Sequence, residues 1–133
     1  MKRICVAGIL CMALLFNPSY IAESYVTHED IVKGMASWYS ETDPGILRTT
    51  ANMEIFDDQG LSCAMWGVPF NTLVKITNVA NGRSVIVRVN DRGPAMRLVK
   101  EGRVIDLTKK AFSSIADTGE GLIRVELNIM PRS

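Results

Sequence analysis

The residues LVKITNVANGRSVIVRVNDRGP, positions 73–94, decide the fold of this chain. Val or Ile takes every second place along 74–76 and again along 85–89, which is the pattern of strands that turn one face to a core. Asn81 and Gly82 lie between the two runs. Both residue types tolerate positive φ, as a two-residue turn of the primed type requires. The stretch therefore predicts a β-hairpin.

Further short strands are predicted on either side of this hairpin. They span residues 35–39, 104–107 and 122–129, and Thr108 can cap a helix after the second of them. One face of that helix carries Ala111, Phe112, Ile115 and Ala116, and Gly119 and Gly121 are expected to end it. About six strands, one short helix and no repeated strand–helix unit predict an all-β fold, a six-stranded barrel that closes its own edges.

The first 22 residues have the layout of a secretory signal. Two basic residues precede an apolar run at 4–16, which is shorter than the roughly 20 residues of a membrane-spanning helix. We expect residues 23–33 to form a linker and residues 34–130 to form one domain. The protein would be exported to the periplasm or cell envelope, or leave the cell, without membrane contact once the signal is removed. An uncleaved anchor or a buried first helix is the alternative.

Charge and cysteine content narrow the class of function. The chain has 15 Lys and Arg and 14 Asp and Glu, and removal of Lys2 and Arg3 with the signal leaves a net charge of about −1. This balance is unlike that of a nucleic-acid-binding protein. Only Cys63 follows the signal, so no internal disulfide is expected, and the single histidine, His28, lies in the linker. We expect Cys63 to be a buried structural thiol and the protein to be a monomer.

Two loops are the places where polar chemistry is expected on such a frame. Residues 49–54 carry Glu54, and residues 89–94, directly after the hairpin, carry Asp91. Taken alone, Asp91 is explained at least as well by an Asx turn with Arg92 paired to a neighbouring acid. Glu54 is explained equally well as an acid in the first turn of a short helix. The residues by themselves leave catalysis open.

Neighbouring side chains form a candidate substrate site. Trp38 and Tyr39 can stack on sugar rings, and Asn52 and Arg92 stand beside the two acids in the loops. A Trp in a first strand is more often part of the core, and this alternative stays open. The acidic residues at 57–58 are expected to be solvated surface.

Five segments in order resemble one known family. They are residues 34–39, 50–54, 68–74, 81–94 and 103–108. Together they are similar to the rare lipoprotein A (RlpA-like) proteins, lytic transglycosylases of the septal-ring type whose domain is a double-psi β-barrel. The resemblance spans about residues 34–129 and implies that fold for this chain.

The resemblance also implies an activity. Such enzymes cleave peptidoglycan glycan strands between N-acetylmuramic acid and N-acetylglucosamine and leave 1,6-anhydro ends, without a cofactor or metal. By motif match the acids carried over are Glu54 and Asp91. The cleavage needs one group to protonate the leaving oxygen and then to take the proton of the muramyl 6-hydroxyl, while a second acid stabilises the developing positive charge. Our hypothesis makes Asp91 the acid/base and Glu54 the stabiliser, with the reverse assignment open.

Some residues differ from the family pattern, and these differences leave two other functions open. Met65 stands where the family commonly has a histidine, and a thioether cannot donate a proton. Ser40, Met53 and Asn71 replace glycines of the family pattern. A non-catalytic, expansin-like module that binds cell-wall glycan is the first alternative, and a secreted interaction domain or inhibitor is the second.

Overall fold

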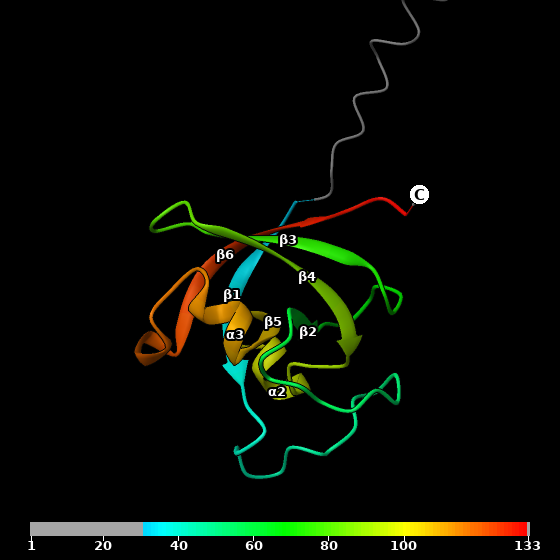
Figure 1. The fold of residues 1–133 in the computed structure, drawn as a ribbon. Coiled ribbons are helices and arrows are strands. Elements are labelled where there is room, and N and C mark those ends of the chain that lie inside the picture. Colours follow the sequence, from blue (N-terminus) through cyan, green and yellow to red (C-terminus); the bar gives the residue numbers. More distant parts are fainter. Residues whose placement is uncertain (1–30, 133) are drawn as a thin grey trace, which may run out of the picture.

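The computed structural model describes residues 31–132 of the chain. The predicted signal and residues 23–30 of the predicted linker lie outside the described residues. Six strands are present in the described part (Figure 1): β1 (Ile31–Tyr39), β2 (Ser62–Ala64), β3 (Leu73–Asn78), β4 (Ser84–Asp91), β5 (Arg103–Thr108) and β6 (Leu122–Ile129). Where one short helix was predicted there are three short helical segments: α2 (Met96–Val99), α3 (Lys109–Ser113) and the 3₁₀ turn η1 (Thr118–Glu120). No helix within residues 31–132 is long and apolar enough to cross a membrane.

The six strands form a closed barrel, which confirms the predicted all-β architecture. Their order around the barrel is β1, β5, β2, β4, β3 and β6, and β6 pairs with β1 to close it. β1 pairs with β5, and β2 with β4, in parallel, while the other neighbours are antiparallel. Closure leaves none of these six strands at a free sheet edge.

The core lies inside the barrel and follows the predicted alternation. Val85, Val87 and Val89 of β4 point inward and are buried, whereas Ile86 between them is 45% exposed. The inward residues of β6 are buried in the same way. Phe112 of α3 is fully buried and packs into the same cluster. The barrel is therefore a packed frame on which the loops are held.

The hairpin of β3 and β4 is confirmed, but its turn differs from the predicted one. Asn78 N donates to Arg83 O at 2.9 Å, so the turn contains four residues. Gly82 has a positive φ of 73°, and Asn81 does not have a positive φ. Asn81 Nδ2 instead donates to Ile115 O at 2.9 Å, and its Oδ1 accepts from Arg83 N at 2.9 Å. The two-residue turn was a wrong prediction because a contact distant in sequence fixes Asn81.

Two element bounds also differ from the prediction. β1 begins at Ile31, so the last three residues of the expected linker belong to the barrel, where they pair with β6. That pairing partner lies about 95 residues away and leaves no local signal. α3 ends at Ser113, well before Gly119, because Asp117 adopts an extended backbone and caps η1 through a bond from Gly119 N.

Candidate active site at the end of β4

Asp91 is the last residue of β4 and lies at an irregularity of the barrel. Along β2, Cys63 pairs with Val89, but the next residue, Ala64, pairs with Asp91, so Asn90 is skipped. Such a bulge changes the direction in which the following side chain points. Asp91 is half-buried, unlike the fully buried Val89. The bulge therefore moves the Asp91 carboxylate out of the core-facing row.

Three donors from three segments fix the Asp91 carboxylate. Oδ1 accepts from the backbone N of Ala51 at 2.9 Å and from that of Arg92 at 2.8 Å. Among residues 31–132, Oδ2 accepts only from Tyr39 Oη, at the long distance of 3.4 Å. A carboxylate can accept about four such bonds. Oδ2 therefore keeps the capacity to bind a proton or a substrate hydroxyl.

Tyr39 lies against Asp91 as a neutral donor. Its ring is stacked on Phe56, with centroids 4.6 Å apart and planes at 10°. Burial, followed by the negative charge of Asp91, raises the pKa of Tyr39 far above its usual value. The phenol therefore stays protonated at neutral pH and can donate to Asp91.

Glu54 has different surroundings, because all of its capacity as an acceptor is used. Its Oε1 accepts from Arg88 Nη1 at 2.6 Å and from Asn52 Nδ2 at 2.9 Å. Its Oε2 accepts from Arg88 Nη2 at 2.8 Å and from Asn90 Nδ2 at 3.1 Å. The bonds from Arg88, then Asn90 and Asn52, lower the pKa of Glu54 to about 2. Glu54 is therefore an ionised group in a two-bond pair with Arg88.

The loop that carries Glu54 also carries the donor to Asp91. Thr50 N donates to Glu54 O at 2.8 Å, and Asn52 Oδ1 accepts from both Thr50 Oγ1 and Glu54 N. These bonds make residues 50–54 one compact turn. Because Arg88 on β4 holds Glu54, it also holds the turn so that Ala51 N faces Asp91.

Met53 and Asn71 adopt the backbone conformation that glycine favours. Their φ values are 71° and 67°. The family resemblance implies glycine at both positions, and a positive φ is the conformation that glycine adopts without strain. Met53 is 79% exposed, so its side chain projects from the turn into solvent. Asn tolerates this conformation better than Met does.

A hollow of ≈ 400 Å³ opens beside Asp91. Its walls include Tyr39, Leu47, Met53 and Phe56, with Asp91 as the one ionisable carboxyl among them. The hollow is therefore mainly apolar, with the Asp91 carboxylate and the hydroxyls of Tyr39, Thr49 and Thr50 as its polar groups, a composition typical of sites that hold a small organic group in a fixed orientation.

The other three predicted substrate residues, Trp38, Asn52 and Arg92, do not line this hollow. Trp38 packs on Phe112, and its Nε1 donates to Thr118 O at 3.0 Å, so its position is that of a partly buried core residue. Arg92 Nη1 donates to Met65 O at 2.8 Å, and its guanidinium lies 3.9 Å from the Phe70 ring centre. The Arg92 side chain thus has partners other than Asp91. Asn52 acts within the turn described above.

Met65 and Cys63 belong to the core. The Met65 side chain is buried and borders a different hollow, which includes Val32 and Trp66. Cys63 is fully buried, as predicted, and burial raises the pKa of its thiol well above the usual value. A thiol in these surroundings is structural.

Asp106 is a half-buried acid that the sequence analysis did not single out. Ser37 Oγ donates to Asp106 Oδ1 at 2.6 Å, and Arg103 Nη1 donates to Ser37 Oγ at 3.1 Å. Burial is the main reason that the pKa of Asp106 is raised. In the sequence, Asp106 alternates with core residues along 104–107. An acid at such a position is also typical of the solvated face of a strand, so the pattern did not mark Asp106 as a site residue.

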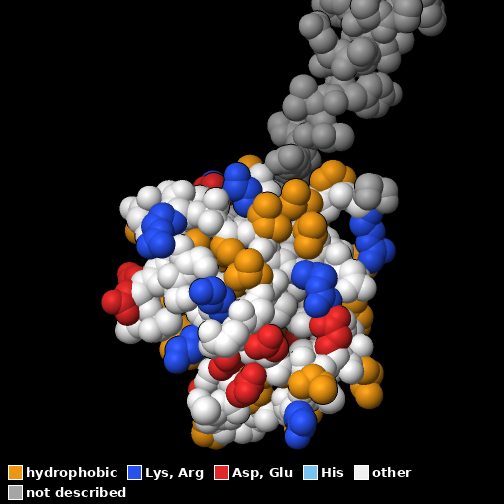
Figure 2. Space-filling view, in the orientation of Figure 1, with side chains coloured by type: hydrophobic (Ala, Val, Ile, Leu, Met, Phe, Trp, Pro, Cys, Tyr) orange, Lys and Arg blue, Asp and Glu red, His pale blue; other side chains and the backbone are white. Residues whose placement is uncertain are grey.

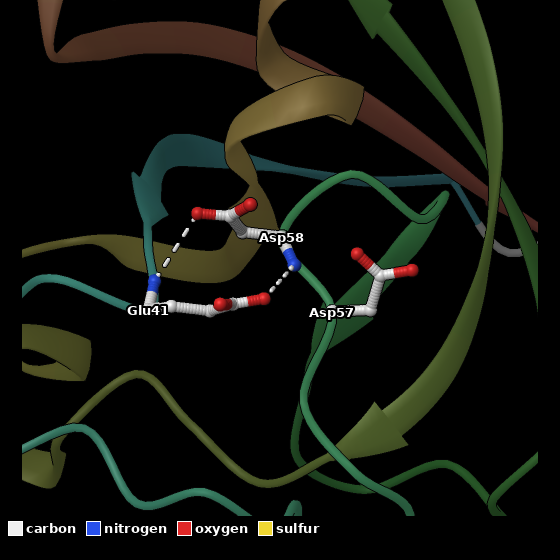
Figure 3. A group of neighbouring side chains, drawn as sticks. All are labelled: Glu41, Asp57 and Asp58. Carbon is white, nitrogen blue, oxygen red and sulfur yellow. Dashed lines mark hydrogen bonds between the residues drawn. The ribbon is translucent and has the colours of Figure 1, made fainter.

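Three acidic side chains lie together on the segment between β1 and β2. Figure 3 shows Glu41 facing Asp58, with Glu41 N donating to Asp58 Oδ2 at 3.2 Å and Asp58 N donating to Glu41 Oε1 at 3.4 Å. With Asp57 they offer oxygens within 4.8 Å of one another, the kind of ligand that hard cations prefer. Acidic side chains also gather on the lower half of the face in Figure 2. The bonds between Glu41 and Asp58 tie the two ends of this segment together, and the expectation of no metal stays a prediction.

Comparison with known sequences identifies the family. Residues 31–127 match the family model described as lytic transglycolase. The chain is 41% identical over 100 residues to the probable endolytic peptidoglycan transglycosylase RlpA of Nostoc sp., covering 75% of this chain and 26% of that one. It is 43% identical over 108 residues to the protein of the same name from Synechocystis sp., covering 81% and 32%. The chain thus spans a third or less of the length of these curated relatives.

Solved structures agree on the fold. The Streptomyces papain inhibitor (SPI) superposes with a TM-score of 0.59 at 19% identity, over 76% of this chain and 94% of its own. The apo expansin of Clavibacter michiganensis gives 0.59 at 19%, over 77% and 52%. At this identity the likeness shows the fold alone. The chain belongs to the lytic transglycolase family, and its domain is an RlpA-like double-psi β-barrel, as the resemblance predicted.

Proposed function

We propose that this protein is an endolytic peptidoglycan transglycosylase. It cleaves the bond between N-acetylmuramic acid and N-acetylglucosamine and leaves a 1,6-anhydro end on the muramyl residue. The observation that carries the proposal is the Asp91 carboxylate, which is oriented by three donors at the edge of a hollow and keeps one oxygen open. An oriented carboxylate with free capacity is what proton transfer requires.

The reaction closes a ring within the substrate. The muramyl 6-hydroxyl oxygen attacks the anomeric carbon, the bond to the leaving oxygen breaks, and the 6-hydroxyl proton passes to Asp91. Tyr39 and the N–H groups of Ala51 and Arg92 hold Asp91 in the orientation for this transfer. In the simplest scheme Asp91 also supplies the proton that the leaving oxygen needs.

Glu54 supports the same step from the neighbouring loop. Its ionised state suits the expected role of stabilising positive charge on the substrate. Arg88, whose Nη1 lies 2.6 Å from Glu54 Oε1, neutralises much of the negative charge of Glu54. We therefore assign Glu54 first to holding the turn of residues 50–54 against Asp91. Because its acceptor positions are filled and its pKa is lowered to about 2, Glu54 is ionised at neutral pH and is not the group that carries the proton.

The proposal also includes the substrate, the oligomeric state and the cellular location of the protein. The substrate is the cell-wall glycan strand, bound in the hollow beside Asp91 with Tyr39 near the reacting bond. The protein acts as a monomer after export, in the periplasm or cell envelope or outside the cell. Binding of substrate by Trp38 and Arg92 stays a prediction, because their side chains contact Thr118 and Met65 and do not line this hollow.

Mass spectrometry of digested glycan tests this function. Purified protein is incubated with peptide-stripped glycan strands, in parallel with the Asp91→Asn variant. Anhydro-ended fragments from the parent that are absent with Asp91→Asn are the expected result. Intact strands that co-sediment with the parent protein would instead support the expansin-like binding module. The observation that favours this alternative is Met65, a buried residue where the resemblance implies a histidine.

A further inference from the structure

A second hollow borders the chain segment that follows Asp91. Its volume is ≈ 330 Å³, and none of the residues that line it also lines the hollow beside Asp91. Arg103, at the start of β5, is the one charged side chain among the described residues that line it. The apolar walls come from three strands, from α2 and from the loop after β2, and include Val32, Val99, Val104, Ile129, Met65 and Trp66. We call this site the Trp66 hollow.

Trp66 is held in place but is not buried. Its Nε1 donates to Pro94 O at 2.7 Å, which fixes the orientation of the indole. The side chain is nevertheless 45% exposed, whereas Trp38 is partly buried and packs on Phe112. Exposed aromatic surface beside an apolar hollow gains free energy when a ligand covers it. Trp66 therefore offers a fixed apolar surface to a ligand.

Three hydrogen bonds join the Trp66 hollow to the segment that carries Asp91. Met65 N donates to Asp91 O at 3.2 Å, and Arg92 Nη1 donates to Met65 O at 2.8 Å. The bond from Trp66 to Pro94 is the third. Residues 65–66 are thus fixed against residues 91–94. Both hollows border this one short segment, because Asp91 lines the first and Pro94 is bonded to a wall of the second.

The chemistry of the Trp66 hollow fits a sugar residue of a glycan strand. Such a strand is a polymer, so sugars next to those at Asp91 contact the surface around residues 91–94. An N-acetylated sugar has C–H groups on its ring face, an acetamido methyl group, and oxygens at its edge. The ring face can pack on Trp66 and the methyl group can enter the apolar hollow, where Met65 replaces the histidine that the family resemblance implies.

Arg103 supplies the polar contact that such a sugar needs. A guanidinium carries five N–H donors, and the bond from Arg103 Nη1 to Ser37 Oγ at 3.1 Å uses one of them. Arg103 also lines the hollow, so its other N–H groups can donate to a hydroxyl or acetamido oxygen. A mainly apolar hollow with one such donor orients a ligand as well as covering it.

We propose that the Trp66 hollow is a second sugar subsite, which binds an N-acetylated sugar residue of the same strand that is cleaved at Asp91. The inference rests on the proposed function and adds to it a preference for long strands. Trp66 is then a specificity-determining residue and takes no part in proton transfer. Affinity rises with strand length until one strand occupies both hollows.

Binding of glycans of different length tests the subsite without cleavage. The Asp91→Asn protein and its double variants with Trp66→Ala and Trp66→Phe are titrated calorimetrically with a peptide-stripped disaccharide, tetrasaccharide and octasaccharide. We expect Trp66→Ala to weaken octasaccharide binding by about 10-fold and disaccharide binding by less than about 2-fold, with Trp66→Phe in between. The octasaccharide should also shift the tryptophan fluorescence of Asp91→Asn, and this shift should be absent in the Trp66→Phe double variant, which retains Trp38.

Controls separate this binding role from a structural one. Ile86→Ala removes an apolar side chain that is also 45% exposed but lines neither hollow, and it should bind every glycan as the parent does. In the cleaving protein, Trp66→Ala should raise KM on long strands and change kcat by less than about 2-fold, whereas a displaced segment at 91–94 would lower kcat.

The results also distinguish this inference from the proposed function. Octasaccharide binding that does not depend on Trp66, or equal losses for the disaccharide and the octasaccharide, would overturn the subsite. A parent that releases no anhydro product, with octasaccharide binding that still depends on Trp66, would overturn the proposed function and leave the sugar subsite supported.

Discussion

The turn at 50–54 and the end of β4 each present one carboxylate, and the two differ in what their oxygens still have to offer. Glu54 receives four side-chain donors and is paired through two bonds with Arg88. Asp91 receives two short backbone bonds and one long bond from Tyr39. In the sequence, both acids lie in similar polar loops. The number of unfilled acceptor positions thus distinguishes the carboxylate that anchors the turn from the one that can react.

Loss of the Asp91 carboxylate is the change with the largest expected effect. Asp91→Asn should lower the release of anhydro-ended fragments by about 100-fold to 10,000-fold, the usual contribution of a general acid or base. Binding to insoluble glycan should persist, because the walls of the hollow are unchanged. Product analysis and co-sedimentation measure the two effects, and near-normal cleavage by a folded Asp91→Asn protein would contradict the assignment.

Removal of Arg88 tests whether Glu54 acts as an anchor for the turn. Arg88→Leu leaves Glu54 without its partner, so we expect about a 10-fold loss of cleavage as the turn shifts, and a loss of about 1 kcal/mol in the free energy of unfolding, as for partly exposed pairs. Arg88→Lys is the matched control, since it keeps the charge but not the two-bond geometry, and it should fall between parent and Arg88→Leu. Urea unfolding and product release report these changes, and equal behaviour of both variants would count against the anchoring role.

The anchor also predicts a pH dependence of stability. The pKa of Glu54 is lowered in the folded protein to about 2, below the value of about 4.3 for an unfolded chain. The stabilisation from this group is therefore fully present above about pH 5 and is lost as the pH falls toward 2. The difference in unfolding free energy between the parent and Glu54→Gln should shrink over that range, by about 1 kcal/mol because the pair is partly exposed. A difference that does not change with pH would show that Glu54 is not held in this way.

The smallest expected effect concerns the backbone of the turn. Met53→Gly should raise the free energy of unfolding by about 0.5 to 1 kcal/mol, because φ is 71° there and glycine adopts that conformation without strain. Asn71→Gly is the contrast, since Asn tolerates positive φ and its Oδ1 accepts from Arg88 Nη1 at 2.9 Å. We expect no gain from that variant. The midpoint of thermal unfolding is measured for both variants. A lower midpoint for Met53→Gly than for the parent would show that the backbone at Met53 is not strained.

Local patterns were enough to predict most of the barrel. The alternation in β3, β4 and β6 and the cap at Thr108, whose side chain accepts from Ala111 N, are all present. β2 was not predicted, because three buried residues are too short a run to show a period. The early start of β1 and the conformation of Asn81 depend on partners far along the chain.

The site was less predictable than the barrel, for physical reasons. Motif match selected Glu54 and Asp91, but nothing local shows that Arg88, 34 residues after Glu54, occupies both of its oxygens. Asp106 was overlooked because an acid that alternates with core residues has the pattern of a surface position. Its burial arises only where β1, β5 and the Gly93 segment meet.

A neutral replacement of the Glu54–Arg88 ion pair shows whether the charge of Glu54 is needed for the reaction or only for holding the turn. The double variant Glu54→Gln with Arg88→Gln removes both charges and retains side chains that can hydrogen-bond across the turn, and its rate of anhydro product release is compared with that of Asp91→Asn. If Glu54 anchors and Asp91 reacts, the double variant keeps cleavage within about 10-fold of the parent while Asp91→Asn falls by about 100-fold or more. A double variant as inactive as Asp91→Asn would contradict the account, because the charge of Glu54 would then be needed for the reaction itself.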